Sequence, residues 1–227
     1  MTPSFPPLMY GEDVQSDAFG HAARRATLGC DAGLISYVLG ASRIEAAMVF
    51  APEVPLAQAM TMLPLCGVGF QNALGALAPP EVAVHLEWSG GIRINGASCG
   101  RFSVAASDPN PAETPDWLVV GFVLPLLPET DETGHTPDET ALFVEGCAEV
   151  QPPLLVEAWA RHTLNWITRW ESDGSRALHT EWRGLAHGIG EDTEDGTFLG
   201  VDEDFGMLLR KDDNTTAIPL TTLLETP

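Results

Sequence analysis

The chain has 227 residues, of which 11 are basic and 32 acidic, so its formal net charge at pH 7 is −21. Such a chain is repelled by phosphate backbones and by anionic membrane surfaces, because affinity for both comes from lysine and arginine side chains. Nucleic acids and membranes are therefore excluded as partners. Lys211 is the only lysine, so no catalytic lysine can precede it.

The hydrophobic fraction of 44% is enough for the core of one fair-sized domain, with or without a small appendage. No apolar run reaches the roughly 18 residues of a membrane span, and the N-terminus lacks the basic and apolar regions of a secretory signal. The four cysteines lie far apart without a C-x-x-C pair, which is typical of reduced core thiols. The expected location is the cytoplasm. No metal site is expected, because the acidic runs 191–195 and 202–204 lack the spacing of a calcium loop.

Hydrophobic spacing and turn residues predict alternating helices and strands in the first half of the chain. The predicted elements are a helix at 16–28, strands at 34–39 and 46–50, a helix at 56–77, and strands at 82–88 and 116–125. Pro64 is expected to kink the second helix, because proline lacks a backbone donor and crowds the carbonyl four residues earlier. Asn95-Gly96 predicts a hairpin, since both positions of the favoured turn need a positive φ.

The second half starts with an acidic segment at 128–135, which we expect to be a surface loop. Thr136-Pro137-Asp138-Glu139 has the form of a capping box and predicts the start of a helix. A long helix is expected from Pro152 or Pro153 to Gly174, and short strands are expected at 196–201, 206–210 and 216–220. The order of elements predicts an α+β fold, with residues 1–182 forming a mixed sheet flanked by helices and 183–227 a small β-barrel-like domain.

Several motifs occur in the order in which biotin–protein ligases carry them. Gly196-T-F-L-Gly200-V-Asp202-E-D-F-Gly206-M-Leu208 resembles the "G-x-x-x-G-I-D-x-x-G-x-L" hairpin of the small SH3-like domain in those enzymes. Val84-HLEWSGGIRING stands where the ligases carry "K-W-P-N-D-I-x-V-x-G", and Ser98-C-G-Arg101 stands where they carry "K-x-x-G". The chain therefore resembles the biotin/lipoate–protein ligase family over about residues 17–220.

The resemblance implies a ligase-like mixed sheet followed by an SH3-like β domain. It implies a small carboxylic acid (biotin, lipoate or a related acid) and ATP as ligands. It also implies a biotinyl or lipoyl carrier domain as the protein partner and a homodimer as the assembly.

The residues that handle the nucleotide in this family are missing from the chain. The lysine of "K-x-x-G" holds the carboxylate and phosphate of the acyl-adenylate, and Ser98 takes its place here. The lysine of "K-W-P-N-D" is Glu87, and the Gly/Arg-rich adenylate loop is reduced to Ala41-Ser-Arg43-Ile44. Loss of a single group that stabilises developing charge costs on the order of 10²–10³ in rate. We therefore predict that standard adenylation is lost unless other cations replace the lysines.

Three arginines are the candidate replacements, because a guanidinium binds carboxylate or phosphate through a bidentate fork. They are Arg43, Arg93 and Arg101. Arg101, Arg43 and Ser98 are the candidate catalytic residues, and all three arginines are candidate ligand contacts. The alternative interpretation is that each arginine is a solvated residue at a strand edge.

The resemblance places four further residues beside the ligand: Trp88, at the position that flanks the biotin ring system, and Ser98, Cys99 and Gly100, where the family backbone approaches it. Each has a structural alternative. Trp88 is then a core aromatic, Cys99 a small buried thiol, and Gly100 the site of a strand bulge.

Two functions remain open at this point. One is an enzyme that attaches a small carboxylic acid to a carrier-protein lysine, with arginines in place of the lost lysines. The other is a non-catalytic binding or regulatory module that keeps the ligase scaffold.

Overall fold

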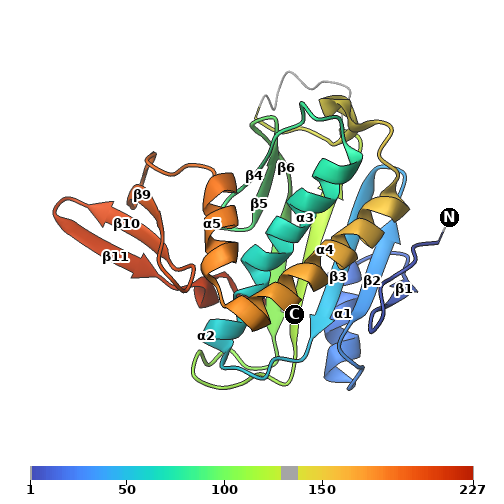
Figure 1. Ribbon diagram of the computed structural model, residues 1–227, viewed down its shortest axis with the longest axis horizontal. Helices are drawn as coiled ribbons and strands as arrows, with labels where there is room; N and C mark the ends of the chain where they lie inside the picture. Colours follow the sequence, from blue (N-terminus) through green and yellow to red (C-terminus); the bar gives the residue numbers. More distant parts are fainter. Residues whose placement is uncertain (1, 129–137, 227) are drawn as a thin grey trace.

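The computed structural model describes residues 2–128 and 138–226. Its main part is a seven-stranded mixed sheet with the order β1-β2-β3-β7-β6-β5-β4 (Figure 1). The strands are β1 Tyr10–Asp13, β2 Leu34–Leu39, β3 Arg43–Phe50, β4 Val84–Leu86, β5 Gly91–Ile94, β6 Ala97–Ala106 and β7 Leu118–Pro125. The helices are α1 Ala18–Thr27, α2 Leu56–Ala59, α3 Met62–Leu77, α4 Pro152–Asp173 and α5 Arg176–Leu185. β1 and β2 pair in parallel, and the other neighbouring strands pair antiparallel.

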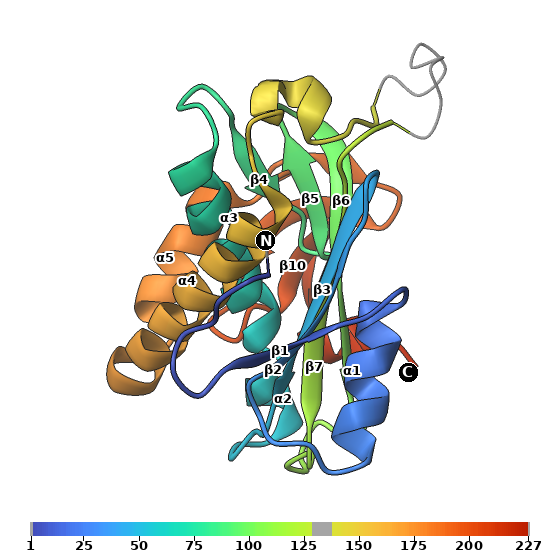
Figure 2. The ribbon, with the colours of Figure 1, turned by 90° about the vertical axis from the view of Figure 1, so that its right-hand side faces the viewer.

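The sheet separates two hydrophobic layers (Figure 2). Helices α3 and α4 pack on one face, where Phe122 meets Trp159 edge-on with the ring centroids 5.0 Å apart. Helix α1 packs on the other face through small side chains, and Ala22 lies against Ala47 and its neighbours. Since side chains of a strand alternate between the faces, this second layer fixes which residues of β3, β6 and β7 point toward α1.

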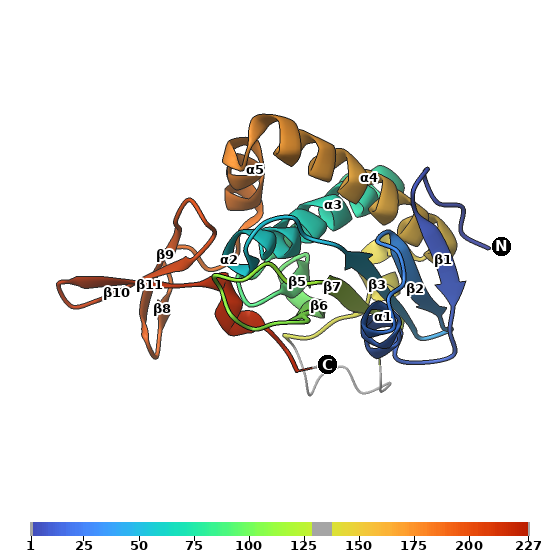
Figure 3. The same cartoon turned by 90° about the horizontal axis from the view of Figure 1, so that it is seen from below.

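The chain after α5 forms a four-stranded antiparallel sheet in the order β11-β10-β9-β8. Its strands are β8 Asp192–Thr193, β9 Gly196–Val201, β10 Met207–Lys211 and β11 Asn214–Ile218. Phe198, Phe205 and Leu209 are buried in the same apolar cluster as the main core. A 3-10 turn, Leu220–Leu223, then returns the chain to the main sheet, and the C-terminus lies beside α1 (Figure 3). The predicted fold class, a mixed sheet flanked by helices and followed by a small β domain, is confirmed.

The segment predicted as one kinked helix consists of two helices, α2 and α3, with the break before Pro64. Thr61 is the N-cap of α3, so Pro64 occupies its first turn. A first-turn residue has no intrahelical partner for its N–H, and proline is therefore accommodated there without a kink. By length and composition the segment Leu56–Leu77 could cross a membrane, but 72% of its most apolar window is buried inside this fold, as in a core helix.

The capping box does not start a helix in the part of it that the structure describes. Asp138 lies in a turn, and Glu139 forms a parallel bridge with Ser98 of β6. The next helical turn, a π-helical one, begins at Phe143. Tertiary pairing with β6 overrides the local helix signal. The other residues of the box, and most of the expected acidic loop at 128–135, lie outside the described residues.

Candidate functional site

Side chains of three neighbouring strands, β3, β7 and β6, lie together on one face of the sheet, the face on which α1 packs. We call it the α1 face. On β3 it carries Arg43 and Glu45, on β6 Arg101 and Ser103, and on β7 Val123, as the strand register shows. Glu45 lies opposite Val123, which in turn lies opposite Arg101. Adjacent strands are about 4.8 Å apart, so these residues form one row across the sheet.

A bulge at Gly100 brings Ser98 to the same face. Arg93 pairs with Ser98 and Gly91 with Arg101, so β6 has one more residue than β5 between the two pairs. Gly100 has φ 116° there, and an added Cβ would lie 2.2 Å from the Val123 carbonyl oxygen. The bulge alternative for this glycine is thus the observed one. It also turns Cys99 into the core, where the side chain has no exposed surface.

Each of the three candidate arginines forms an ion pair with a carboxylate of this chain. Arg43 Nε lies 2.8 Å from Glu45 Oε1, and Arg93 Nε lies 2.5 Å from Glu87 Oε1. Arg101 pairs with Glu225 near the C-terminus. Glu87, which stands in the position of a family lysine, therefore neutralises the arginine beside it. None of the three cations is available for a phosphate as the structure stands.

The carboxylate of Glu45 is fixed at the N-terminus of α1. Glu45 is only 7% exposed, and its Oε2 accepts a hydrogen bond from the backbone N–H of Ala18 at 3.1 Å. This N–H belongs to the first helical turn, which favours a negative charge. Glu45 also pairs with Arg43. The Arg43 end of the α1 face is therefore occupied by a carboxylate that belongs to strand β3.

Arg101 and Ser103 together bind the carboxylate of Glu225. Ser103 Oγ donates to Glu225 Oε1 at 2.9 Å, and the Arg101 guanidinium contacts the same oxygen. The backbone N–H of Glu225 donates to the Val104 carbonyl at 2.8 Å. In this part of the α1 face, Arg101 and Ser103 therefore hold a carboxylate that comes from the tail of the chain.

Ser98 contributes its backbone to β6, and its N–H donates to the Asp138 carbonyl at 2.8 Å. Arg93, which lies opposite Ser98, also donates through Nη1 to the Gly96 carbonyl at 2.7 Å. Burial raises the pKa of the Cys99 thiol to about 12, which keeps it protonated at neutral pH. The contacts of Ser98, Arg93 and Cys99 are thus with other parts of the fold.

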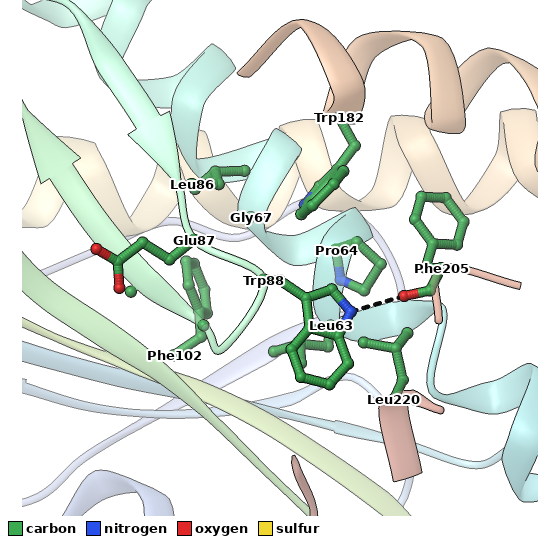
Figure 4. A pocket seen from close by; sticks show the side chains of 12 residues that line it. Leu63, Pro64, Gly67, Leu86, Glu87, Trp88, Phe102, Trp182, Phe205 and Leu220 are labelled. Carbon is green, nitrogen blue, oxygen red and sulfur yellow. Dashed lines mark hydrogen bonds between the residues drawn. The ribbon is translucent and has the colours of Figure 1, made fainter. Parts of the chain in front are cut away.

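Trp88 lies apart from the α1 face, at the contact between the main sheet and the small β domain. Its Nε1 donates to the Phe205 carbonyl at 2.8 Å (Figure 4). The cavity that Trp88 lines measures about 20 Å³. Aromatic and aliphatic side chains surround it, including Trp182, Phe102 and Leu63. A volume of this size holds about one water molecule, so a bicyclic ring has no room there in this conformation.

A larger hollow lies on the α1 face, between helix α1 and the C-terminal tail. It measures about 720 Å³, within the range of pockets that hold small ligands. Phe19, Ala23 and Arg24 of α1 line it on one side, and Glu225 on the other. The hollow thus opens directly beside the carboxylate that Arg101 and Ser103 hold.

The connection between β2 and β3 spans residues 40–42, and Gly40 N–H donates to the Arg43 carbonyl at 3.0 Å. A turn of this length cannot wrap a nucleotide. Among residues 2–128 and 138–226, no group of three or more His, Cys, Asp or Glu side chains is placed to hold a metal ion. Within residues 2–128 and 138–226, this face therefore has a carboxylate held by Arg101 and Ser103, and the β2–β3 connection is too short to act as a nucleotide loop.

Comparison with known proteins gives the family. Residues 5–184 match the biotin/lipoate A/B protein ligase family. The chain belongs to this family. Residues 189–226 match a separate domain family of unknown function, DUF4444. No curated protein matches the chain.

Solved structures agree with this assignment. A biotin protein ligase-like protein of unknown function from Silicibacter sp. TM1040 is 61% identical, with a TM-score of 0.94 over 99% of this chain and 100% of that one. The biotin protein ligase of Aquifex aeolicus shares the fold at 13% identity, with a TM-score of 0.72 over 95% and 96% of the two chains. That of Leishmania major, in complex with biotinyl-5-AMP, is 17% identical, with a TM-score of 0.56 over 94% and 98%.

The sequence made Arg101 a candidate, but it did not indicate the two residues that Arg101 lies with in the structure, Ser103 and Glu225. Ser103 follows Arg101 by two positions in β6, after the predicted Asn95-Gly96 turn, so period-two alternation was a usable signal for it. Glu225 gave no signal, because its place on the sheet depends on how the tail folds back. Glu45 was likewise missed, although it follows Arg43 by two positions in β3.

Proposed function

We propose that the protein binds a small carboxylic acid on the α1 face, with its carboxylate at Arg101 and Ser103, and does not adenylate it. One observation carries the proposal: these two side chains already hold a carboxylate, that of Glu225. A charged hydrogen bond from a guanidinium is among the stronger polar contacts in proteins. The same donors therefore suit the carboxylate of biotin, lipoate or a related acid.

The hollow beside α1 supports the position of the rest of the ligand. Phe19 offers it apolar surface, and Val123, which is 39% exposed, lies in the strand row next to Arg101. A carboxylate at Arg101 thus places an aliphatic chain near apolar side chains. The Aquifex aeolicus ligase has been solved in complex with biotin and ATP, and that ligand class motivates the choice of acids.

The electrostatics of the α1 face argue against nucleotide chemistry. ATP brings several negative charges, and its reaction with a carboxylate needs uncompensated cations around the α-phosphate. Arg43 and Arg93 are neutralised by Glu45 and Glu87, and the net charge of the chain is −21. A ligand with a single negative charge is compatible with one arginine, whereas a triphosphate is not.

Calorimetric titration with biotin, lipoate and octanoate, each with and without ATP and Mg²⁺, tests the proposal. We expect at least one acid to bind without ATP, ATP to leave its affinity unchanged, and no pyrophosphate to be released. Arg101→Gln should weaken binding by about 10- to 100-fold, because a hydrogen bond to a charged group contributes about 1.5–3 kcal/mol. Arg210→Gln is the matched control, since Arg210 is exposed on β10 of the small domain.

Two results would overturn the proposal. Failure of every acid to bind at millimolar concentration removes the binding function. Release of pyrophosphate followed by transfer of the acid to a biotinyl or lipoyl carrier domain replaces it with the ligase activity of the family.

A further inference from the structure

The C-terminal tail reaches the carboxylate site by adding a short piece of strand to the edge of β6. On that edge β5 pairs no further than Arg101, and the carbonyl of Gly90 accepts the N–H of Phe102 at 2.7 Å. Beyond this point the edge is taken over by the tail. Leu224 forms a parallel bridge with Val104, and Glu225 N–H donates to the Val104 carbonyl at 2.8 Å.

The tail is firmly anchored before this point and lightly held after it. Leu220, in the 3-10 turn, is 4% exposed and belongs to the main core, whereas the Glu225 side chain is 36% exposed. Glu225 is held by one backbone hydrogen bond, by Ser103 and by Arg101. The last residues can therefore leave the sheet without exposing the anchor.

Of Arg43, Arg93 and Arg101, only Arg101 is paired with a carboxylate from the tail, which can leave the edge of β6. Glu45 is a residue of β3. The backbone N–H of Glu87 donates to the Gly91 carbonyl at 2.8 Å, across the turn between β4 and β5. Both carboxylates are fixed by the strands that carry or follow them. Glu225 reaches its arginine from the C-terminal tail, whose described residues meet the main sheet at Val104 through the Leu224 bridge and the Glu225 N–H.

We infer that the tail is an internal competitor of the acid: Glu225 occupies the Arg101–Ser103 site in the free protein, and a ligand carboxylate binds there by displacing it. This inference rests on the proposed function and adds its regulation. The apparent dissociation constant then equals the intrinsic one divided by the fraction of molecules whose tail has left. Any partner or change that removes the tail raises acid affinity without touching the acid's own contacts.

The test compares acid binding in the wild type, in Glu225→Gln and in Glu225→Ala. The first substitution removes the competing charge and keeps the side-chain shape, and the second removes the whole competing carboxylate while leaving Leu220 and Leu224 in place. We expect both variants to bind the acid about tenfold more tightly than the wild type, as the loss of an exposed ion pair and one hydrogen bond predicts. Glu203→Gln, an exposed carboxylate between β9 and β10, is the matched control and should bind as the wild type does.

Amide hydrogen exchange gives a second measurement that does not depend on affinity. Exchange at the Glu225 amide should accelerate when the acid is added, and also in Arg101→Gln without acid, because either change removes the carboxylate's partner. Equal affinity in the wild type and both tail variants, with Glu225 still protected in the complex, overturns the inference and leaves the proposed function intact. Absence of acid binding in all four proteins overturns the proposed function itself.

Discussion

Arg101 and Glu225 lie 124 residues apart in the chain and form an ion pair on the α1 face of the main sheet. The pair connects the strand that carries a ligase motif to the last residues after the small β domain. In the comparison with the family motif, Ser98 stands in the place of the lysine, and Arg101 follows it three residues later. The structure pairs that arginine with a carboxylate from the tail of the same chain.

Trp88→Phe tests the contact between the main sheet and the small β domain. The substitution removes the hydrogen bond from Nε1 to the Phe205 carbonyl and keeps most of the apolar surface. We expect the free energy of unfolding to fall by about 1 kcal/mol, as for an ordinary hydrogen bond, and acid binding to stay unchanged. Urea unfolding and the acid titration measure the two quantities. Loss of acid binding with an intact fold would place the ligand at Trp88 and contradict the site proposed above.

Gly69→Ala tests the close packing of α3 on α4. An added Cβ would lie 2.7 Å from Thr163 Oγ1 and 3.1 Å from the Thr163 backbone nitrogen, so the helices must move apart. Overpacking of this kind costs about 1–3 kcal/mol. Gly75→Ala is the control on the same helix: its Cβ meets only Gln71 Nε2 at 3.7 Å, and alanine should stabilise the helix by about 0.5–1 kcal/mol. Equal unfolding free energies for the two variants would show that this contact is looser than described.

Alkylation tests the structural interpretation of Cys99. Burial raises the pKa of this thiol to about 12 and also raises the pKa of Cys66, so both remain protonated and inaccessible at pH 8. Iodoacetamide should modify the native protein first at the half-buried Cys30, as peptide mass spectrometry would show. Rapid modification of Cys99 in the folded protein would contradict this structural interpretation.

The lowered pKa of Glu12 predicts how the stability of the fold changes with pH. The hydrogen bond with His21, at 2.7 Å, and then those from Arg25 hold the pKa of this carboxyl below its ordinary value of 4.5. A carboxyl with a lowered pKa in the folded state stabilises the fold above its unfolded pKa, and this contribution is lost as the pH falls through the folded value. Glu12→Gln should therefore be less stable than the wild type at pH 7, and the difference should shrink below about pH 4.5. A difference in unfolding free energy that does not change with pH would contradict this.

Local patterns predicted much of the fold. The Asn95-Gly96 turn joins β5 to β6 with both residues at positive φ, as the dipeptide requires. Helix α4 runs from Pro152 to Asp173, and Gly174 caps it with φ 75°. Helix α5 was missed, although Leu178, Trp182 and Leu185 have helical spacing. Strand β1 was missed because its four residues, YGED, have no apolar alternation.

The site was predictable only in part, for a physical reason. Strand alternation and a glycine bulge are local properties, and they put Arg101 and Ser98 on one face. The partners of the arginines depend on tertiary structure, and no local pattern links Arg101 to a glutamate in the tail. The missing lysine and the short β2–β3 turn could be read from the sequence. The carboxylate that fills the remaining site could not.

The most direct test of acid binding is the structure of the protein crystallised with the acid that binds most tightly in the titration. We predict that the ligand carboxylate lies within hydrogen-bond distance of the Arg101 guanidinium and Ser103 Oγ, with its apolar chain in the hollow beside α1 and Glu225 displaced. An acid bound at Trp88, or anywhere else with Glu225 still paired to Arg101, would contradict the account.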